Sequence, residues 1–317
     1  MINTELRKQG IVPVVTIQNV EDAVPLAAAI IEGGLNIIEV TFRSDVAYEA
    51  INEIHKAYPQ MIILAGTILT IEQVDQAIEA GAQVLVSPGL NRKIVEYCLS
   101  KEIQIIPGCS SPSDLEQALE CGLKIVKFFP AEANGGINAI KAMSAPYGGL
   151  QFMPTGGINE QNLMDYLSFD KVIACGGSFM CTSQMIQNKD WMKITEQTKN
   201  AIKKVLNFEF AHLGVNLIDK DLISSINQFK SLLSTEIIRE TSKSTFVDFI
   251  EIMHDSNFGK CGHIGIATSD IDRAIYYLSK QNFSFDLESI TYDEKKNKKF
   301  IYINEEMNGF KIHLIKK

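Results

Sequence analysis

Eight short apolar runs recur along the first two thirds of this 317-residue chain, and longer stretches with helical spacing separate them. The runs span residues 11–17, 36–42, 61–67, 84–89, 104–109, 124–130, 152–157 and 172–178. Each run has the length of a buried strand, and a strand followed by a helix, repeated eight times, predicts an α/β fold that closes into a TIM (β/α)8 barrel. A doubly wound open sheet is the alternative, but eight near-equal units favour closure.

Helix-start signals support this alternation. Residues 20–31 and 71–80 have helical spacing, and Asn19, Thr70 and Ser111 stand where N-capping residues are expected. Pro112 follows Ser111 at the first helical position, where proline is favoured.

A shift in composition near residues 201–208 predicts a domain boundary. All nine prolines lie at or before Pro154, whereas four of the five histidines lie after residue 206. The boundary follows a predicted helix that begins near Trp191. We therefore expect one domain over residues 1–206 and a smaller α+β domain over residues 207–317.

Composition restricts the possible functions. The net charge of −8 argues against a nucleic-acid partner, because phosphate backbones bind clusters of Lys and Arg. No run approaches the ~20 apolar residues of a membrane helix, and no signal peptide opens the chain. None of the six cysteines stands in a CxxC pair, which favours reduced, buried thiols. We predict a cytoplasmic protein without a membrane partner.

The strongest catalytic candidate is Lys127, which lies within the apolar run 124–130. Strand alternation places Lys127 on the same face as Ile125 and Phe129, with Lys124 on the other face. A desolvated lysine has a lowered pKa, and its neutral amine can attack a carbonyl to form a Schiff base. Glu39, in a second apolar run, is the expected partner and a candidate general acid/base. A purely structural ion pair is the alternative.

Two glycine-rich strand ends predict an anion site. Gly156 and Gly157 close the seventh run, and Ser178 closes the eighth. Barrels often bind phosphate after these two strands, where backbone N–H groups can approach it closely. Arg43 can clamp a carboxylate or a phosphate. His55 has no histidine companion before residue 207, so we expect no metal in the barrel.

Six strings together resemble the bacterial 2-keto-3-deoxy-6-phosphogluconate / 2-keto-4-hydroxyglutarate aldolases. They read IIEVTFR, AGTIL, SPGL, KFFPAEANGG, PTGGI and GGS, in this order over residues 1–206. The resemblance implies a class I, Schiff-base aldolase that forms a homotrimer and needs no cofactor. Its substrate would be a sugar acid, and pyruvate would be a product.

The same resemblance implies roles for individual residues. Lys127 matches the Schiff-base lysine and Glu39 the general acid/base. The positions that match the pyruvate pocket are Arg43, Thr67, Pro88 and Phe129, and those that match the phosphate site are Gly156, Gly157 and Ser178.

Residues 207–317 carry two similar starts, AHLGV at 211–215 and GHIGI at 262–266. Helix-like stretches at 221–233 and 270–280 follow, with closing strands at 247–253 and 309–315. This order resembles the paired βαβββ modules of the glyoxalase / vicinal-oxygen-chelate family. The resemblance implies a divalent metal site at His212, Glu251, His263 and His313, with Zn²⁺, Ni²⁺, Mn²⁺ and Fe²⁺ as candidates. A degenerate module for assembly or regulation is the alternative.

Two further functions stay open from the sequence. The barrel could act on the C4 epimer of the 6-phosphogalactonate series, since one hydroxyl configuration depends on fine pocket geometry. It could instead be a non-catalytic sugar-acid sensor that signals through the C-terminal domain.

Overall fold

The computed structural model describes residues 2–217, 221–254, 259–294 and 296–317. The chain divides into two compact units, Met1–Val205 and Leu206–Lys317. Within the described ranges, no helix is both long and apolar enough to span a membrane.

The first unit is a nearly closed barrel of eight parallel strands, as predicted. Its strands are β1 Ile11–Val15, β2 Ile37–Thr41, β3 Ile62–Gly66, β4 Val84–Ser87, β5 Gln104–Cys109, β6 Ile125–Phe128, β7 Gln151–Pro154 and β8 Cys175–Gly177. Neighbours run in the order β7-β6-β5-β4-β3-β2-β1-β8. The bridges Phe152–Val172 and Thr155–Gly176 join the two ends of this order, so the sheet curls back on itself.

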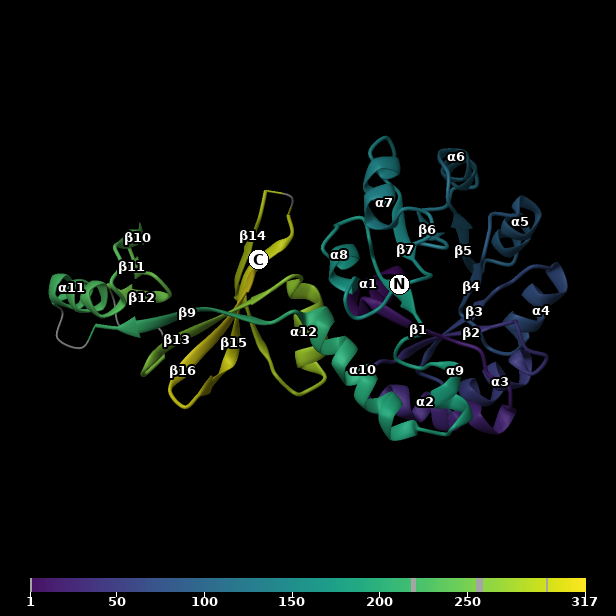
Figure 1. Ribbon diagram of the computed structural model, residues 1–317, viewed down its shortest axis with the longest axis horizontal. Coiled ribbons are helices and arrows are strands. Elements are labelled where there is room, and N and C mark those ends of the chain that lie inside the picture. The colour runs from purple at the N-terminus through teal and green to yellow at the C-terminus, as the bar shows by residue number, and fades with distance from the viewer. Residues whose placement is uncertain (1, 218–220, 255–258, 295) are drawn as a thin grey trace. The chain divides into compact units, whose positions relative to one another are not determined.

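Helices alternate with these strands and surround them in Figure 1. They are α1 Ile2–Gln9, the 3-10 turn η1 Val20–Asp22, α2 Ala23–Glu32, α3 Ala47–Ala57, α4 Ile71–Glu79, α5 Arg92–Ser100, α6 Pro112–Glu120, α7 Gly136–Ser144, α8 Leu163–Leu167, α9 Ser183–Gln187 and α10 Trp191–Leu206. Alternating strands and helices place every strand end on one side of the barrel.

The predicted caps are confirmed at two of three positions. Thr70 accepts a hydrogen bond from the Gln73 backbone, and Ser111 forms a full capping box before Pro112. The expectation for Asn19 was wrong. Its side-chain amide donates to the carboxylate of Asp22 and caps no backbone N–H group, and the 3-10 turn η1 separates it from α2.

The barrel interior changes from apolar to polar along its axis. Apolar residues from strands β1 to β7 form a buried core together with Leu6 of α1 and with Ile173 and Ala174, which directly precede β8. Two residues further along their strands stand Glu39, Lys127 and Thr155, all buried. Because strand side chains alternate with period two, these polar groups point into the same interior as the core beneath them.

The second unit contains two copies of a βαβββ module, as the sequence predicted. The first copy is β9 Glu209–Asn216, α11 Leu222–Leu233, β10 Ile237–Glu240, β11 Ser244–Val247 and β12 Ile250–Met253. The second is β13 Gly262–Thr268, α12 Ile271–Ser279, β14 Phe285–Tyr292, β15 Lys298–Met307 and β16 Phe310–Lys316. The closing strand expected over 247–253 begins later, because Asp248 adopts a left-handed turn between β11 and β12.

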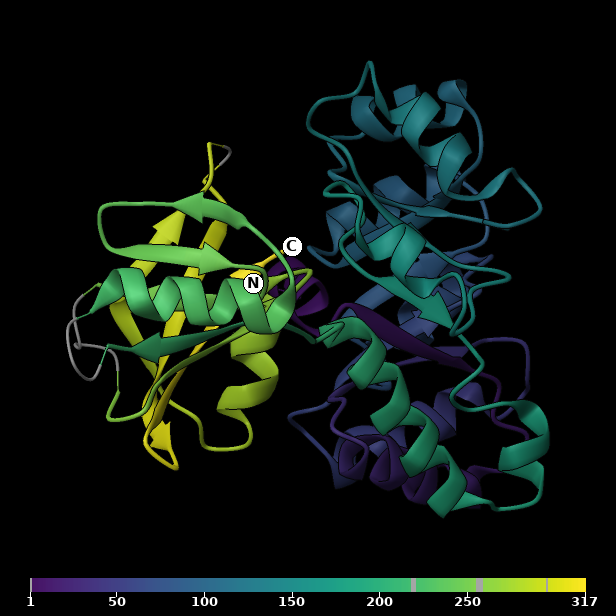
Figure 2. The ribbon, with the colours of Figure 1, turned by 60° about the vertical axis from the view of Figure 1, so that its left-hand side comes forward.

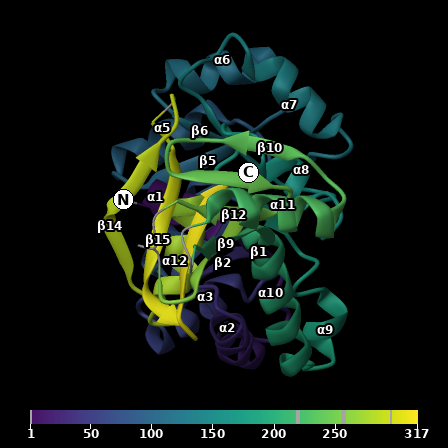
Figure 3. The same cartoon turned by 90° about the vertical axis from the view of Figure 1, so that its left-hand side faces the viewer.

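The two copies share one eight-stranded sheet in the order β10-β11-β12-β9-β13-β16-β15-β14. Figure 3 shows β10 and β14 near its two edges. Strands β9 and β13 pair antiparallel at the centre, so the copies are related by a pseudo-two-fold axis between them. Figure 2 shows α11 lying over the strands of this sheet.

The two faces of this sheet differ. Leu213 and Val215 of β9 pack with Ile226 and Phe229 of α11 in an apolar cluster. His212 and Gly214 alternate with them and therefore point to the opposite face. That opposite face holds the polar groups described below.

Candidate active site and candidate metal centre

The barrel site is built around one buried ion pair. Lys127 Nζ lies 3.0 Å from Glu39 Oε1, and the two side chains are 7% and 0% exposed. Lys127 Nζ also lies 5.3 Å from the centre of the Phe129 ring. Lys124, in contrast, is exposed, as the strand alternation predicted. Removing one partner of a buried pair costs about 3–5 kcal/mol, because it strands the other charge.

Glycine makes room for this pair. A Cβ atom added to Gly66 of β3 would lie 2.4 Å from Glu39 Oε1, closer than any real contact. The carboxylate therefore occupies space that a side chain on the neighbouring strand would fill.

A cavity of about 300 Å³ opens above the pair. All nine residues that the sequence singled out for the barrel line it: Glu39, Arg43, Thr67, Pro88, Lys127, Phe129, Gly156, Gly157 and Ser178. These residues come from the ends of six different strands or the loops after them. The structure thus brings them to one place, while the chemical role of each remains a proposal.

Thr41 also lines this cavity and was missed by the sequence analysis. Its hydroxyl donates to the Val15 carbonyl at 3.1 Å and accepts from Arg43 Nε at 3.2 Å. Thr16 Oγ1 lies 2.8 Å from the same hydroxyl. This network holds Nε of the Arg43 guanidinium. Thr41 could have been found in the sequence, because it lies two residues after Glu39 and therefore points to the same side of the strand.

Thr155 is a second lining residue that was missed. It stands at the end of β7, directly before the two glycines that drew attention instead. Its hydroxyl is buried and has no hydrogen-bond partner among the described residues, and the same holds for Glu39 Oε2. Unsatisfied buried polar atoms in a cavity are typical of groups that bind a ligand.

Thr67 adopts a left-handed backbone conformation, with φ of +61°. For a β-branched residue this conformation costs about 1–3 kcal/mol. Such strain is typical of functional sites, where the surrounding structure holds a residue in place.

The glycine end of the cavity is braced from behind. The Gly157 carbonyl accepts hydrogen bonds from the side-chain amides of Asn159 and Asn162 at 3.2 and 3.0 Å. Glu132 lies so close that a Cβ on Gly157 would come within 2.5 Å of its Cγ. The buried Tyr166 hydroxyl in turn donates to Glu132 Oε1. Gly157 is therefore fixed on two sides.

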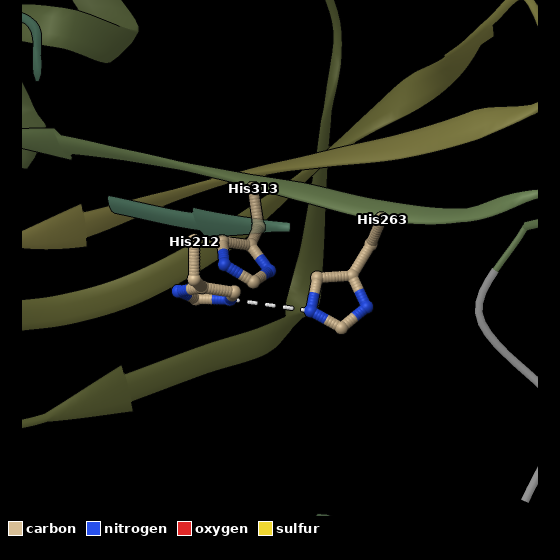
Figure 4. A group of neighbouring side chains, drawn as sticks. All are labelled: His212, His263 and His313. Atoms are coloured by element: carbon tan, nitrogen blue, oxygen red, sulfur yellow. Dashed lines mark hydrogen bonds between the residues drawn. The ribbon is translucent and has the colours of Figure 1, made fainter. Parts of the chain in front are cut away.

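A second cluster of ionisable groups lies on the open face of the C-terminal sheet. The rings of His212, His263 and His313 point toward one another from three strands (Figure 4). One ring nitrogen of each histidine lies within 4.8 Å of the others. Glu251 joins them, with Oε2 3.1 Å from His212 Nε2 and 3.0 Å from His263 Nε2. All four residues predicted for a metal site therefore lie together.

A repeated His-x-Gly pattern shapes this cluster. A Cβ on Gly214 would lie 2.0 Å from His263 Cε1, and a Cβ on Gly265 would lie 2.5 Å from His212 Cε1. Each glycine clears the space that the histidine of the other module occupies. The signal for this was present in the sequence as HLG and HIG, but only the histidines were singled out.

The geometry of the cluster fits a divalent metal. Two ligand atoms bound at about 2.1 Å to one ion lie about 3.0 Å apart at an octahedral angle and about 3.4 Å apart at a tetrahedral angle. His212 Nε2 and His263 Nε2 are 3.2 Å apart, and both are near 3 Å from Glu251 Oε2. Both ring nitrogens of buried His313 have no hydrogen-bond partner in the described chain.

The electrostatics also suit a cation. Burial raises the pKa of Glu251, but hydrogen bonds from His212 and His263 outweigh it and hold the pKa well below its usual range. Burial, together with the neighbouring His263 and His212, lowers the pKa of His313 to about 3. The site thus offers a carboxylate and a neutral imidazole, the forms that bind metals.

The first unit is a (β/α)8 barrel with a buried lysine–glutamate pair among its strand ends, the architecture that many barrel enzymes use for an active site. Residues 2–197 match the model of the KDPG and KHG aldolase family, and the chain belongs to that family. The match ends before the second unit.

Individual relatives agree with this assignment. The chain is 46% identical over 200 residues to the 2-dehydro-3-deoxy-phosphogluconate aldolase of Treponema pallidum. This alignment covers 63% of this chain and 95% of that protein. The KDPG aldolase structure from Legionella pneumophila, with pyruvate captured as a covalent carbinolamine, has a TM-score of 0.61 and 38% identity over 63% of this chain and 97% of that one. The structure of the Zymomonas mobilis ZM4 2-keto-3-deoxy-6-phosphogluconate aldolase with 3-phosphoglycerate has a TM-score of 0.60 and 37% sequence identity. The match covers 63% of this chain and 94% of that one.

Proposed function

We propose that the barrel is a class I aldolase. It cleaves 2-keto-3-deoxy-6-phosphogluconate to pyruvate and glyceraldehyde 3-phosphate, 4-hydroxy-2-oxoglutarate to pyruvate and glyoxylate, or both. The observation that carries this proposal is the Lys127 amine, buried in the cavity and 3.0 Å from Glu39. The captured pyruvate adduct in the Legionella relative supports it.

The proposed reaction follows from this geometry. Lys127 passes a proton to Glu39, 3.0 Å away, and its amine then adds to the C2 carbonyl of the substrate. Glu39 returns the proton to the departing hydroxyl, so loss of water gives an iminium ion and leaves Glu39 as a carboxylate. The C4 hydroxyl proton passes to Glu39, through a water, as the C3–C4 bond breaks. The electron pair of that bond moves into the iminium as an enamine, and the aldehyde departs. Protonation at C3 and hydrolysis then release pyruvate and the free lysine.

The remaining lining residues bind the two ends of the substrate in this proposal. The pyruvate carboxylate lies near Arg43 and Thr67, between Pro88 and Phe129. A phosphate lies against the N–H groups of Gly156 and Gly157 and the Ser178 hydroxyl, since glycine lets an anion approach the backbone. We propose no cofactor for this chemistry, a homotrimeric assembly and a cytoplasmic location.

The test is borohydride reduction in the presence of pyruvate, followed by intact mass and peptide mapping. A reduced pyruvyl adduct on Lys127 is expected, together with its loss in Lys127→Ala. The matched control is Lys124→Ala, which should label normally because Lys124 is exposed. Absence of any adduct would contradict the proposal and favour a non-catalytic sensor. An adduct on Lys124 instead would contradict the assignment of Lys127 as the Schiff-base lysine.

For the second unit we propose a divalent metal held by His212, His263, His313 and Glu251, on a glyoxalase / vicinal-oxygen-chelate-like domain over residues 207–317. The near-3 Å spacing of the ligand atoms carries this proposal. When bound, such an ion acts as a Lewis acid toward oxygen ligands. The four side chains would hold the ion on this face of the sheet.

Metal content of the full chain tests this proposal after exposure to Zn²⁺, Ni²⁺, Mn²⁺ and Fe²⁺ in turn. We expect about one ion per chain with one of these metals, and loss of binding in His263→Ala. His254→Ala is the matched control, because His254 bonds to Thr245 and lies outside the cluster. Equal metal content in both variants would exclude the site.

A further inference from the structure

Arg43 lies between two hollows of the barrel. On one side it lines the cavity of about 300 Å³ that contains the buried ion pair. On the other side it lines a second pocket of about 450 Å³, together with the acidic residues Asp45, Glu49 and Glu79. The Arg43 side chain is exposed, and among the described residues its guanidinium has one polar contact, which is to Thr41. The three acids therefore do not hold the guanidinium.

The hydroxyl of Thr41 meets three groups, and their chemistry fixes the direction of each hydrogen bond. Arg43 Nε, 3.2 Å away, can only donate, and the Val15 carbonyl, 3.1 Å away, can only accept. A hydroxyl has one proton and two acceptor sites. Its proton goes to Val15, so Thr16 Oγ1, at 2.8 Å, donates the third bond. Thr41 is therefore an acceptor toward Arg43, with all of its hydrogen-bonding positions filled.

The sheet holds this acceptor in a fixed place. Thr41 is the last residue of β2 and is 1% exposed. Strands β1 and β2 pair in parallel, with Val14 opposite Glu39. Thr16 and Thr41 lie two residues further along these strands and point to the same side as that pair. The acceptor therefore belongs to the same strand face as the carboxylate that pairs with Lys127.

The bond through Nε determines which donors of Arg43 remain. Four N–H groups are left on the two terminal nitrogens, and they form a planar fork. This fork matches the two oxygens of a carboxylate. A hydrogen bond from a charged donor to a buried acceptor stabilises more than an exposed ion pair does. Thr41 is therefore expected to outweigh the acids of the second pocket.

We propose that Thr41 is a positioning residue of the aldolase. It holds the Arg43 guanidinium at the cavity, with the terminal nitrogens free for the substrate carboxylate. The inference rests on the proposed function, in which Arg43 binds that carboxylate. Thr41 acts on substrate binding through Arg43 and not on the bonds that form and break at Lys127.

The test measures borohydride trapping on Lys127 in the full-length chain, by intact mass, over a range of ketone concentrations. Pyruvate carries the carboxylate, whereas methyl pyruvate presents the same C2 ketone as a neutral ester. Thr41→Val keeps the shape of the side chain and removes the hydroxyl. It should raise the half-saturating concentration of pyruvate about tenfold, since one such hydrogen bond contributes about that factor. The value for methyl pyruvate should change less than about twofold.

Three further variants serve as controls. Thr41→Ser keeps the hydroxyl and should bind pyruvate within about twofold of wild type. Thr195→Val is the matched control for the loss of a buried threonine hydroxyl, because Thr195 donates to the Ala29 carbonyl at 3.0 Å and does not line the cavity. Arg43→Met removes the partner, so adding Thr41→Val to it should have little further effect.

The outcomes separate this inference from the proposed function. Absence of an adduct in the wild-type chain would overturn both. Normal trapping in wild type, with the same pyruvate dependence in Thr41→Val, would overturn the inference alone. An equal loss for pyruvate and methyl pyruvate, or a further tenfold loss in the Arg43→Met background, would assign Thr41 a structural role and contradict the inference.

Arg43→Met also gives a test that does not depend on how well Thr41→Val folds, because it changes an exposed side chain. It should weaken trapping by pyruvate at least tenfold and leave trapping by methyl pyruvate within about twofold. An unchanged ratio between the two ketones in Arg43→Met would overturn the inference without any Thr41 variant.

Discussion

The barrel cavity and the histidine cluster both gather ionisable groups on a sheet, but they balance charge differently. In the barrel, an ammonium and a carboxylate lie 3.0 Å apart and neutralise each other. In the second unit, one carboxylate lies beside a group of three imidazoles, and no lysine or arginine belongs to this cluster. The charges of the lysine–glutamate pair therefore balance within the chain. The histidine cluster, in contrast, has metal-binding groups without a cation and needs one from outside.

The largest expected effect breaks the barrel pair. Glu39→Gln should lower kcat for aldol cleavage by about 10²–10⁴-fold, because the amide cannot take up the C4 hydroxyl proton. Steady-state kinetics with both substrates measures this, and metal content of the second unit serves as the internal control. A kcat within threefold of wild type would remove Glu39 from the chemistry.

The next largest expected effect is a difference in thiol reactivity between cysteines of the two units. Burial raises the pKa of Cys98 to about 11 and that of Cys109 and Cys181 to about 12, whereas Cys261 in the second unit is exposed. Since the thiolate is the reacting form, iodoacetamide at pH 8 should modify Cys261 about 10²–10³-fold faster than these three. Peptide mass mapping over time gives the rates, and comparable labelling of Cys109 in the native protein would be inconsistent with its burial.

A smaller effect tests the clearance that glycine provides in the histidine cluster. Gly265→Ala places a Cβ 2.5 Å from the His212 ring and should weaken metal binding by about 10–100-fold while leaving the aldolase unchanged. Gly148→Ala is the control, because nothing lies within 4 Å of its added Cβ. Unchanged metal affinity in Gly265→Ala would mean that the ligands lie elsewhere.

The smallest effect concerns the brace behind Gly157. Tyr166→Phe removes the hydrogen bond to Glu132 and should raise KM for the phosphorylated substrate about fivefold, roughly 1 kcal/mol. The KM for 4-hydroxy-2-oxoglutarate, which has no phosphate, should stay constant. A parallel rise for both substrates would point to general loosening of the barrel.

Sequence periodicity was sufficient for the folds of both units, because each strand is either an apolar run or part of a repeated module. The buried lysine could be located since one charge in an apolar strand is conspicuous. Thr41 and Thr155 escaped notice because threonine is ordinary in strands, and only the closed barrel shows their hydroxyls to face the cavity.

The duplicated module carries one further consequence. His212 and His263 occupy equivalent places in the two copies, but the partner of Gly214 is Glu251 whereas the partner of Gly265 is His313. A metal site with true two-fold symmetry would present the same residues to a bound molecule in either of two orientations. In the proposed metal centre this exchange of one donor breaks the two-fold symmetry, so the two ends of a bound molecule would meet unlike neighbours and one orientation would be preferred.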